Sequence, residues 1–219
     1  MGLSKRDIAY DYLRKQIVFC KLKPGDLLDE KQITEQLGIS RTPVREAINK
    51  LAEENLLTIF PRKGITVSQI SLRDLQDMIE SRLLVEPYLL QQTFVRLDTD
   101  SLQEFRNKVK ERGTGSGTDM DSIEDDFDFS FHMYFAKKAN NQYLESLMST
   151  LLALSQRTRI FLPWSPDRVT ASANEHLAII DCALNGDQEG AIDAIRTHLS
   201  HSREGYMHVF QSHSDFFRV

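Results

Sequence analysis

The chain has 219 residues and a formal net charge of −5, with 27 Lys and Arg against 32 Asp and Glu. This length accommodates a small domain followed by a larger one, and the acidic total, taken over the whole chain, argues against a nucleic-acid-binding protein. The charge is unevenly distributed, however: residues 1–70 carry 12 basic and 9 acidic side chains, whereas residues 71–219 carry 15 and 23. A nucleic-acid contact is therefore expected in the first 70 residues.

The sequence offers no segment for membrane insertion. No signal peptide precedes the first predicted helix, and no apolar run approaches the ~18 residues of a spanning helix. We therefore expect a cytoplasmic protein with no membrane partner.

The first 37 residues predict two helices separated by a turn. Apolar residues at helical spacing favour a helix over residues 4–20. Lys-Pro-Gly-Asp at 23–26 ends this segment with a tight turn. A short amphipathic helix is expected to follow, from about Glu30 to Leu37.

The next segment has the pattern of a turn and a recognition helix. Gly38 suits the turn, because glycine adopts positive φ without strain. Ser40 is placed to cap the next helix, and Pro43 falls in its first turn, where a missing N–H costs nothing. The helix has an inward apolar stripe at spacings of four and three, formed by Val44, Ile48 and Leu51.

The other side of this helix is polar and basic. Arg41, Thr42 and Arg45 project from its first turn, where a recognition helix meets base edges and phosphates of DNA. An ordinary capped amphipathic helix is the alternative for this segment alone.

The residues that follow favour the DNA-binding interpretation. Residues 56–60 and 65–68 predict two strands, joined by a hairpin of sequence Pro-Arg-Lys-Gly. The adjacent cations Arg62 and Lys63 at its tip suit contact with phosphates or the minor groove, although a solvated basic turn would look the same.

Three motifs within residues 4–70 resemble those of the GntR family of bacterial transcription regulators: Lys-Pro-Gly-Asp-x-Leu-x-Glu, Gly-Ile-Ser-Arg-Thr-Pro-Val-Arg-Glu-Ala and the Arg-Lys-Gly of the hairpin. The resemblance implies a winged helix-turn-helix domain over residues 1–70, with Arg41 and Arg45 as the principal DNA contacts. It also implies assisting contacts from Ser40, Thr42, Arg62, Lys63 and Gly64. Lys31 falls where other members carry a contacting arginine, and lysine cannot make a bidentate contact.

Residues 71–219 predict an all-helical domain. Ser71 is placed to cap a helix that runs to about Val95 and bends at Pro87. Further helices are expected over about 100–111, 119–139, 141–162, 167–185 and 187–211, with a glycine-rich loop at 112–118. The predicted fold is therefore mainly α, a winged helix-turn-helix followed by an antiparallel bundle of about six helices.

Four side chains of this domain form a candidate metal site. Asp128 and His132 are four residues apart, which places a carboxylate and an imidazole on one helix face. His176 and His198 lie similar distances from the Asn-Gly-Asp connection at 185–187, so they reach nearly the same height when the last two helices pack antiparallel. Such a set suits Zn²⁺, Ni²⁺ or Mn²⁺. Core histidines with ordinary hydrogen bonds and a solvated acidic run are the alternative.

The pattern from Asp128 to Asn140 and the spacing from His176 to His198 resemble the C-terminal effector domain of FadR-like GntR regulators, often called the FCD domain. In many of those domains an Asp and three His in this arrangement bind a divalent metal at the base of a cavity. The resemblance therefore implies that Asp128, His132, His176 and His198 are metal ligands.

The same resemblance implies an effector site beside the metal. Arg82 falls where such domains carry an arginine, and it is expected to fix a carboxylate effector. Asn140 belongs to the pattern as well. The alternatives are a surface salt bridge of Arg82 with Glu80 or Glu86, and a purely structural cap at Asn140.

The leading hypothesis is a transcriptional regulator, most often a repressor in such proteins, that binds a palindromic operator as a homodimer and responds to a small organic acid. In an alternative, the divalent metal itself is the signal. A metal-dependent hydrolase is a remote third, because no general base stands beside the four ligands and a DNA-binding domain would be unexplained. We therefore expect no enzyme activity and no catalytic residue; effector and operator sequence stay undetermined.

Overall fold

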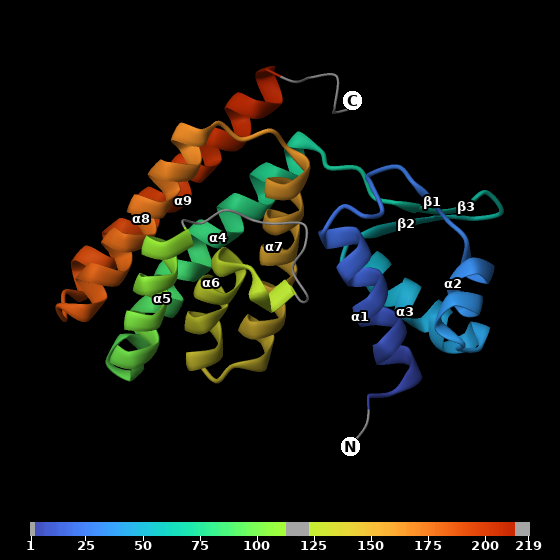
Figure 1. Cartoon of the computed structure of the whole chain (residues 1–219), viewed down its shortest axis with the longest axis horizontal. Helices are drawn as coiled ribbons and strands as arrows, with labels where there is room; N and C mark the ends of the chain where they lie inside the picture. The colour runs from blue at the N-terminus through green and yellow to red at the C-terminus, as the bar shows by residue number, and fades with distance from the viewer. Residues whose placement is uncertain (1–2, 113–122, 213–219) are drawn as a thin grey trace. The chain divides into compact units, whose positions relative to one another are not determined.

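The computed structural model describes residues 3–112 and 123–212 (Figure 1). These residues form two compact units that divide between Ile70 and Ser71. The first unit is the winged helix-turn-helix and the second is the helical bundle, so the predicted fold class is confirmed.

Within residues 3–70, three helices and three strands form the N-terminal unit. The helices are α1 (Lys5–Val18), α2 (Glu30–Leu37) and α3 (Arg41–Glu53). The strands β1 (Leu27–Leu28), β2 (Leu57–Phe60) and β3 (Gly64–Val67) make an antiparallel sheet in the order β1-β3-β2. Helices α1 and α3 pack on each other over a core of buried aliphatic side chains that includes Leu13, Ile17, Val44, Ile48, Leu51 and Val67.

The turn that presents α3 has the expected geometry. Gly38 ends α2 in the left-handed region, with φ of 63°. Ser40 occupies the N-cap position of α3 with an extended backbone, but its hydroxyl makes no capping hydrogen bond within the described chain. Pro43 lies in the first helical turn. The expected N-cap position is therefore present at Ser40, without the expected side-chain hydrogen bond.

Two elements differ from the sequence-based expectation. β1 was not predicted, because Leu27 and Leu28 are too few to show the alternation of a strand; they pair with Thr66 and Ile65 of β3. The helix expected over 119–139 begins only at Phe127 as α6, since Asp126 caps it by accepting a hydrogen bond from the Phe129 N–H at 2.9 Å. Residues 119–122 of that expectation lie outside the described residues.

Six α-helices form the described part of the C-terminal unit. They are α4 (Leu72–Thr93), α5 (Thr99–Arg112), α6 (Phe127–Lys138), α7 (Gln142–Phe161), α8 (Pro166–Leu184) and α9 (Gln188–Ser212), with short 3₁₀ turns at Phe94–Arg96 and Ile123–Asp125. Helices α8 and α9 run side by side from their tight connection, and α4 packs against α6, α7 and α9 (Figure 1). The described helices include none that is both long and apolar enough to cross a membrane.

Candidate metal centre and nucleic-acid interface

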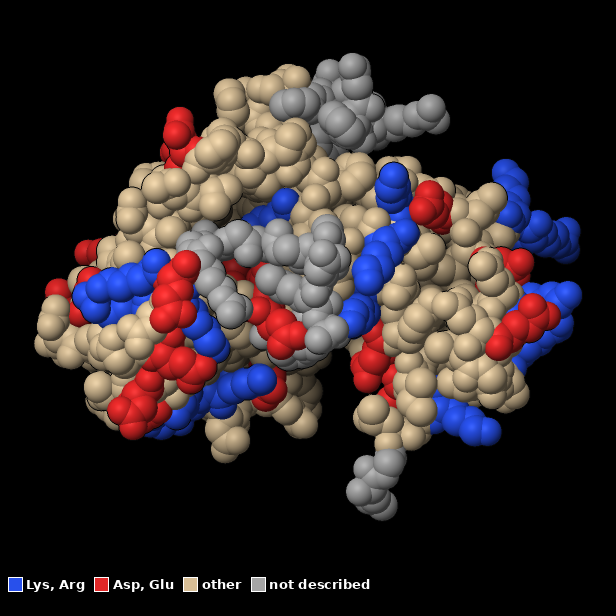
Figure 2. Space-filling view, viewed as in Figure 1, with Lys and Arg blue, Asp and Glu red and all other residues tan. Residues whose placement is uncertain are grey.

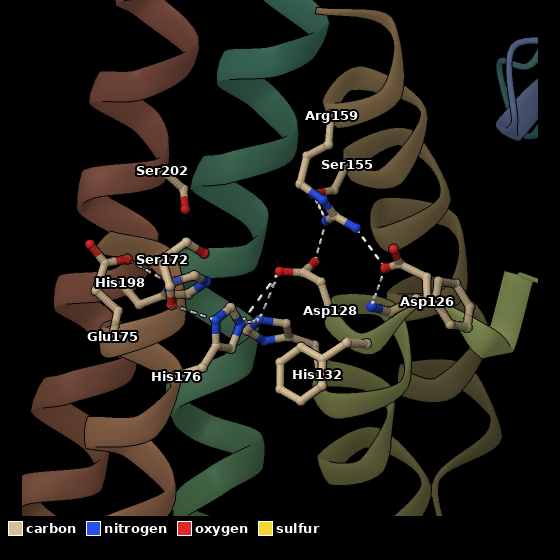
Figure 3. Close-up of polar contacts among 12 residues, drawn as sticks. Asp126, Asp128, His132, Ser155, Arg159, Ser172, Glu175, His176, His198 and Ser202 are labelled. Carbon is tan, nitrogen blue, oxygen red and sulfur yellow. Dashed lines mark hydrogen bonds and ion pairs between the residues drawn. The ribbon is translucent and has the colours of Figure 1, made fainter. Parts of the chain in front are cut away.

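Three helices bring the four predicted metal ligands together. Asp128 and His132 come from α6, His176 from α8 and His198 from α9, and their side chains point toward one another (Figure 3). One ligand atom from each lies within 4.8 Å of all the others, and all four residues are buried. The two ligands spaced four residues apart on α6 therefore lie next to the two histidines of the antiparallel α8–α9 pair.

Each imidazole makes a hydrogen bond through Nδ1, the ring nitrogen on the side away from the other ligands. His132 Nδ1 lies 2.5 Å from Glu86 Oε2, and His198 Nδ1 lies 2.8 Å from Glu175 Oε2. His176 Nδ1 lies 2.7 Å from the backbone oxygen of Ser172. An ionised carboxylate or a carbonyl can only accept, so each Nδ1 carries the proton and each Nε2 keeps its lone pair.

The atoms that face the centre of the cluster, the histidine Nε2 atoms and Asp128 Oδ1, are all hydrogen-bond acceptors, and none of them has a donor to pair with inside the cluster. His132 Nε2 is 3.3 Å from His176 Nε2, and Asp128 Oδ1 is 3.4 Å from His176 Nε2 and 3.7 Å from His132 Nε2. Lone pairs at these distances repel one another unless a positive charge lies between them. The donor set of three neutral imidazoles and one carboxylate therefore fits a divalent transition metal.

The electrostatics of the site favour the protonation states that metal binding requires. Burial lowers the pKa of His132, and burial together with the neighbouring His176 lowers the pKa of His198 to about 3. Burial alone would raise the pKa of Asp128, but Arg159 and His132 hold it well below its usual range. At neutral pH His132 and His198 are thus uncharged and the Asp128 carboxylate is ionised, as ligands must be.

Arg159 of α7 orients the carboxylate ligand. Its Nη2 lies 2.6 Å from Asp126 Oδ1, and its Nη1 pairs with Asp128 Oδ2 (Figure 3). The guanidinium occupies one oxygen of Asp128 and leaves Oδ1 facing the three imidazoles. Asp126 thus has two tasks, because it caps α6 and also holds Arg159.

A cavity of about 230 Å³ opens beside the ligand cluster. Arginine, hydroxyl and apolar side chains line it, together with two of the predicted ligands: Arg82, Asp128, Ser155, Arg159, Leu162, Trp164, Arg168, Val169, Ser172, His198, Ser202 and Tyr206. Five of the bundle helices contribute to it, α4 and α6–α9, which places a binding space next to the candidate metal.

Arg82 of α4 lies at the floor of this cavity and is only 1% exposed. Its Nε pairs with Glu86, which is equally buried, and its Nη1 donates to Ser155 Oγ at 2.9 Å. Nη2 has no hydrogen-bond partner among the described residues. The ion pair with Glu86 is therefore present, but it is a buried pair and not the surface pair considered as the alternative.

Asn140 does not line the cavity. It is exposed in the turn between α6 and α7, with φ of 52°, and its N–H donates to the carbonyl of Lys137 at 3.1 Å. Asn140 is also eight residues beyond His132, or roughly 12 Å along a helix. Asparagine tolerates the left-handed conformation that this turn requires, so the structure supports the structural alternative.

The residues predicted to contact DNA are all exposed. They are Lys31, Ser40, Arg41, Thr42, Arg45, Arg62, Lys63 and Gly64. Arg45 has 65% of its side chain exposed and its Nε donates to Glu30 Oε2 at 2.9 Å, whereas Lys31 lies 3.7 Å from Glu35. Arg45 is therefore exposed and makes a surface ion pair with Glu30 of α2.

The hairpin between β2 and β3 presents its cations at a sharp tip. Phe60 pairs with Gly64, Arg62 adopts a φ of 64°, and the Lys63 N–H donates to the Phe60 carbonyl at 3.0 Å. Figure 2 shows basic side chains gathered at the end of this hairpin. The turn therefore presents the two exposed positive charges of Arg62 and Lys63 at the tip of the hairpin.

Sequence reasoning missed the residues that hold the ligands. Glu86 was considered only as a partner of Arg82, and its bond to His132 crosses between helices. Glu175 directly precedes His176 in the sequence, yet it binds His198 and His201, and Arg168 at 3.0 Å. The Arg-x-x-x-Glu spacing on α4 was the one available signal for Glu86.

Comparisons with known proteins agree with this division of the chain. Residues 5–67 match the bacterial regulatory proteins of the gntR family, and residues 77–201, more than half of the chain, match the FCD domain. The HTH-type transcriptional repressor RspR of Escherichia coli K12 is 27% identical over 212 residues, covering 95% of this chain and 91% of RspR. The matched relatives regulate transcription and are not enzymes.

Solved structures share the fold. McbR/YncC of E. coli has a TM-score of 0.77 at 23% identity, covering 94% of this chain and 99% of that one. The Zn²⁺-bound FCD domain of TM0439 has a TM-score of 0.51 at 22% identity, covering 64% of this chain and 96% of that domain.

Proposed function

The chain belongs to the gntR family of bacterial regulatory proteins and carries an FCD domain, and from this premise we propose that it binds a palindromic operator as a homodimer and responds to a small carboxylate held beside a divalent metal. It is a DNA-binding transcriptional regulator. The name of RspR, a repressor, supports repression as its mode of action.

The convergence of four buried acceptor atoms carries the metal part of the proposal. Asp128, His132, His176 and His198 would hold the ion, and the Zn²⁺-bound FCD domain of TM0439 supports zinc as the first candidate, with Ni²⁺ and Mn²⁺ as the others. When bound, such an ion supplies positive charge and open coordination positions for an anionic ligand. Glu86, Glu175 and the Ser172 carbonyl keep the imidazoles in the required tautomer.

Arg82 is the proposed anchor for the carboxylate of the effector. Arg82 lines the cavity, and its Nη2 is the one buried nitrogen of this guanidinium that no described residue binds. A carboxylate there would satisfy a buried donor and pair with its charge. Asn140 is not part of the proposed effector site.

The proposed DNA interface combines α3 and the β2–β3 hairpin. Arg41, Thr42 and Arg45 would meet base edges and phosphates, and Arg62 and Lys63 would meet the backbone or the minor groove. Two copies would place two α3 helices about one DNA turn apart. The effector acts as a switch if its affinity differs between the DNA-bound and free states.

A second candidate function is a metal-responsive regulator. One observation favours it: the protein alone supplies four ligand atoms, the number that a tetrahedral site requires, without any contribution from an effector. In that case operator affinity would follow metal occupancy directly.

Elemental analysis of the purified full chain tests the proposal, combined with operator binding before chelation, after chelation and after metal return. About one transition metal per chain, with operator affinity unchanged on its removal and the effector response lost, supports the carboxylate-responsive regulator. Operator affinity that tracks metal content supports the metal sensor instead.

A matched pair of variants tests the ligand set. His176→Ala should reduce bound metal, whereas His208→Ala, an exposed histidine on α9, should retain it. Equal metal content in the two variants, or no metal in the unmodified protein, would refute the assignment.

A further inference from the structure

We infer that Glu30 of α2 is a positioning residue for base recognition: it holds the guanidinium of Arg45 so that the two terminal nitrogens of the arginine read a guanine end-on. The carboxylate thereby increases the difference in affinity between the operator and other DNA, and not affinity for DNA in general. This inference rests on the proposed DNA interface, because it assigns a base and a supporting residue to one of the proposed contacts.

The ion pair between α2 and α3 uses one nitrogen of the arginine. Arg45 Nε donates to Glu30 Oε2 at 2.9 Å, and the terminal nitrogens Nη1 and Nη2 donate to no described residue. A guanidinium has two forks of donors, one formed by Nε with a terminal nitrogen and one formed by the two terminal nitrogens. Because Nε is occupied, the end-on fork is the one that remains available for DNA.

The carboxylate comes from a capped and packed helix. Glu30 is the first residue of α2, and Asp29 caps this helix by accepting a hydrogen bond from the Lys31 N–H at 2.8 Å. Ile33 of the same helix is buried in the core, and α2 packs against α3. Only 28% of the Glu30 side chain is exposed. A group on such an element orients its partner better than a group on a loop.

The pair lies where the contact with DNA is proposed. Glu30 and Arg45 both line a hollow between α3 and the β2–β3 hairpin, and Arg62 of the hairpin tip lines it as well. A carboxylate at this surface repels the phosphates of any duplex that binds there. Its charge therefore lowers affinity for DNA of every sequence, so attraction of the DNA backbone is not its role.

The carboxylate contributes selectivity among bases. Guanine presents two acceptors, O6 and N7, which match an end-on guanidinium fork, whereas adenine presents N7 beside an amino group that is itself a donor. An arginine side chain without a partner can turn to a phosphate, and a phosphate contact carries no sequence information. The bond from Arg45 Nε to Glu30 opposes that turn, so more of the binding depends on which base is present.

Equilibrium binding of the full chain to two duplexes tests the inference. One duplex is an operator selected from a random library, and the other has the same length and a random sequence. Each guanine of the operator is replaced by adenine in turn. The guanine whose replacement no longer matters in Arg45→Ala is the one that Arg45 reads, and the ratio of the two dissociation constants at that position measures discrimination.

Two variants of Glu30 separate its hydrogen bond from its charge. Glu30→Ala should lower the guanine-to-adenine ratio by roughly fivefold or more, while affinity for the random duplex stays level or rises. Glu30→Gln keeps an oxygen that accepts from Nε and removes the charge. It should therefore retain the ratio within about twofold and bind the random duplex more tightly.

Glu53→Gln is the matched control for the loss of charge. Glu53 is an exposed carboxylate at the last residue of α3, and its replacement removes the same charge from the N-terminal unit. The guanine-to-adenine ratio of this variant should equal that of the unmodified protein. Melting temperatures of all the variants identify any general damage to the fold.

The outcomes distinguish this inference from the function on which it rests. An unchanged ratio in Glu30→Ala overturns the inference, whether the variant gains or loses affinity for both duplexes equally. The inference also fails when Arg45→Ala weakens binding without removing the preference for any guanine; the proposed DNA interface then stands. Operator binding that is unaffected by Arg45→Ala overturns both the inference and the proposed role of Arg45.

Discussion

Glu86 uses both of its carboxylate oxygens within the C-terminal unit, one on Arg82 and the other on His132. Burial alone would raise its pKa, but Arg82 and His132 lower it to about 2, so it stays ionised. One side chain thus orients the proposed effector anchor and a proposed metal ligand together. This makes Glu86 the residue whose replacement is most informative.

Glu86→Gln should weaken zinc binding by roughly 10- to 100-fold, although all four ligands remain. The glutamine carbonyl would accept from Arg82, and its amide would then donate to His132 Nδ1. That hydrogen bond moves the imidazole proton to Nε2, which faces the other ligands. The measurement is a competition titration with a chromophoric chelator. Glu80→Gln, an exposed position on the same helix, is the control, and equal affinity in the two variants would contradict the role of Glu86.

Arg45→Ala should weaken operator binding by roughly tenfold or more, because a bidentate base contact contributes about 1–3 kcal/mol of discrimination. The side chain is 65% exposed, so stability should change little. Gel-shift titration on a duplex selected from a random library measures the effect. Arg73→Ala, an exposed arginine of α4, should bind like the unmodified protein; an Arg45 variant that did the same would remove α3 from the interface.

At the scale of elements, α9 sets the position of Trp164 in the connection between α7 and α8. A Cβ added at Gly205 would lie 2.8 Å from Trp164 Cζ3. No larger side chain fits there without moving the indole that walls the cavity. The small residue in the middle of α9 therefore bears on the shape of the binding space.

Gly205→Ala should weaken effector binding while leaving zinc content unchanged. The helix itself gains about 1 kcal/mol from the replacement, but displacing the indole costs about 1–3 kcal/mol, so the melting temperature should stay level or fall. Titration with a panel of small organic acids and elemental analysis of the same preparation measure the two effects. A variant that keeps full affinity would show that Trp164 moves without cost to the site.

Local signals explain which elements the sequence predicts. Gly38 in the turn and Ser71 at the N-cap define helix boundaries through local geometry, and both predictions are confirmed. The structure adds Asp74, which completes a capping box with Ser71. Two features that the sequence does not predict depend on contacts with residues distant in the sequence. β1 forms because β3 pairs with it. α6 starts later than expected because Asp126 caps it and binds Arg159.

The candidate site divides in the same way. Asp128 and His132 follow from helical spacing, and His176 and His198 follow from the symmetry of the α8–α9 connection. Glu86 lies on another helix, 46 residues before His132, and no periodicity relates the two. Asn140 was drawn into the site by pattern alone, whereas its backbone conformation explains its presence in the turn.

At the scale of the whole chain, the two units have net charges of opposite sign, and each is suited to a different kind of partner. The first 70 residues are basic and present exposed cations, whereas the remainder is acidic and encloses buried acceptors. Because binding to the folded state stabilises it, metal should affect the stability of the C-terminal unit selectively.

Chelation should therefore lower the melting temperature of the C-terminal unit. At a free zinc concentration of about 100 times the Kd, the lost stabilisation is about 2.7 kcal/mol, or roughly 5–10 °C for a unit of this size. Scanning calorimetry of the full chain, with zinc and with chelator, measures it. His176→Ala should show no difference between the two conditions. Identical curves for the unmodified protein would mean that the cluster does not bind zinc.

Trp164 is the single tryptophan of the chain, and it lies in the wall of the cavity with its indole nitrogen buried. The tryptophan emission of the protein consequently originates at one known place, a side chain that lines the cavity. Any change in polarity or hydrogen bonding there alters the colour and intensity of that emission. The intrinsic fluorescence of Trp164 therefore reports ligand binding in the cavity, in the intact chain and without an attached dye.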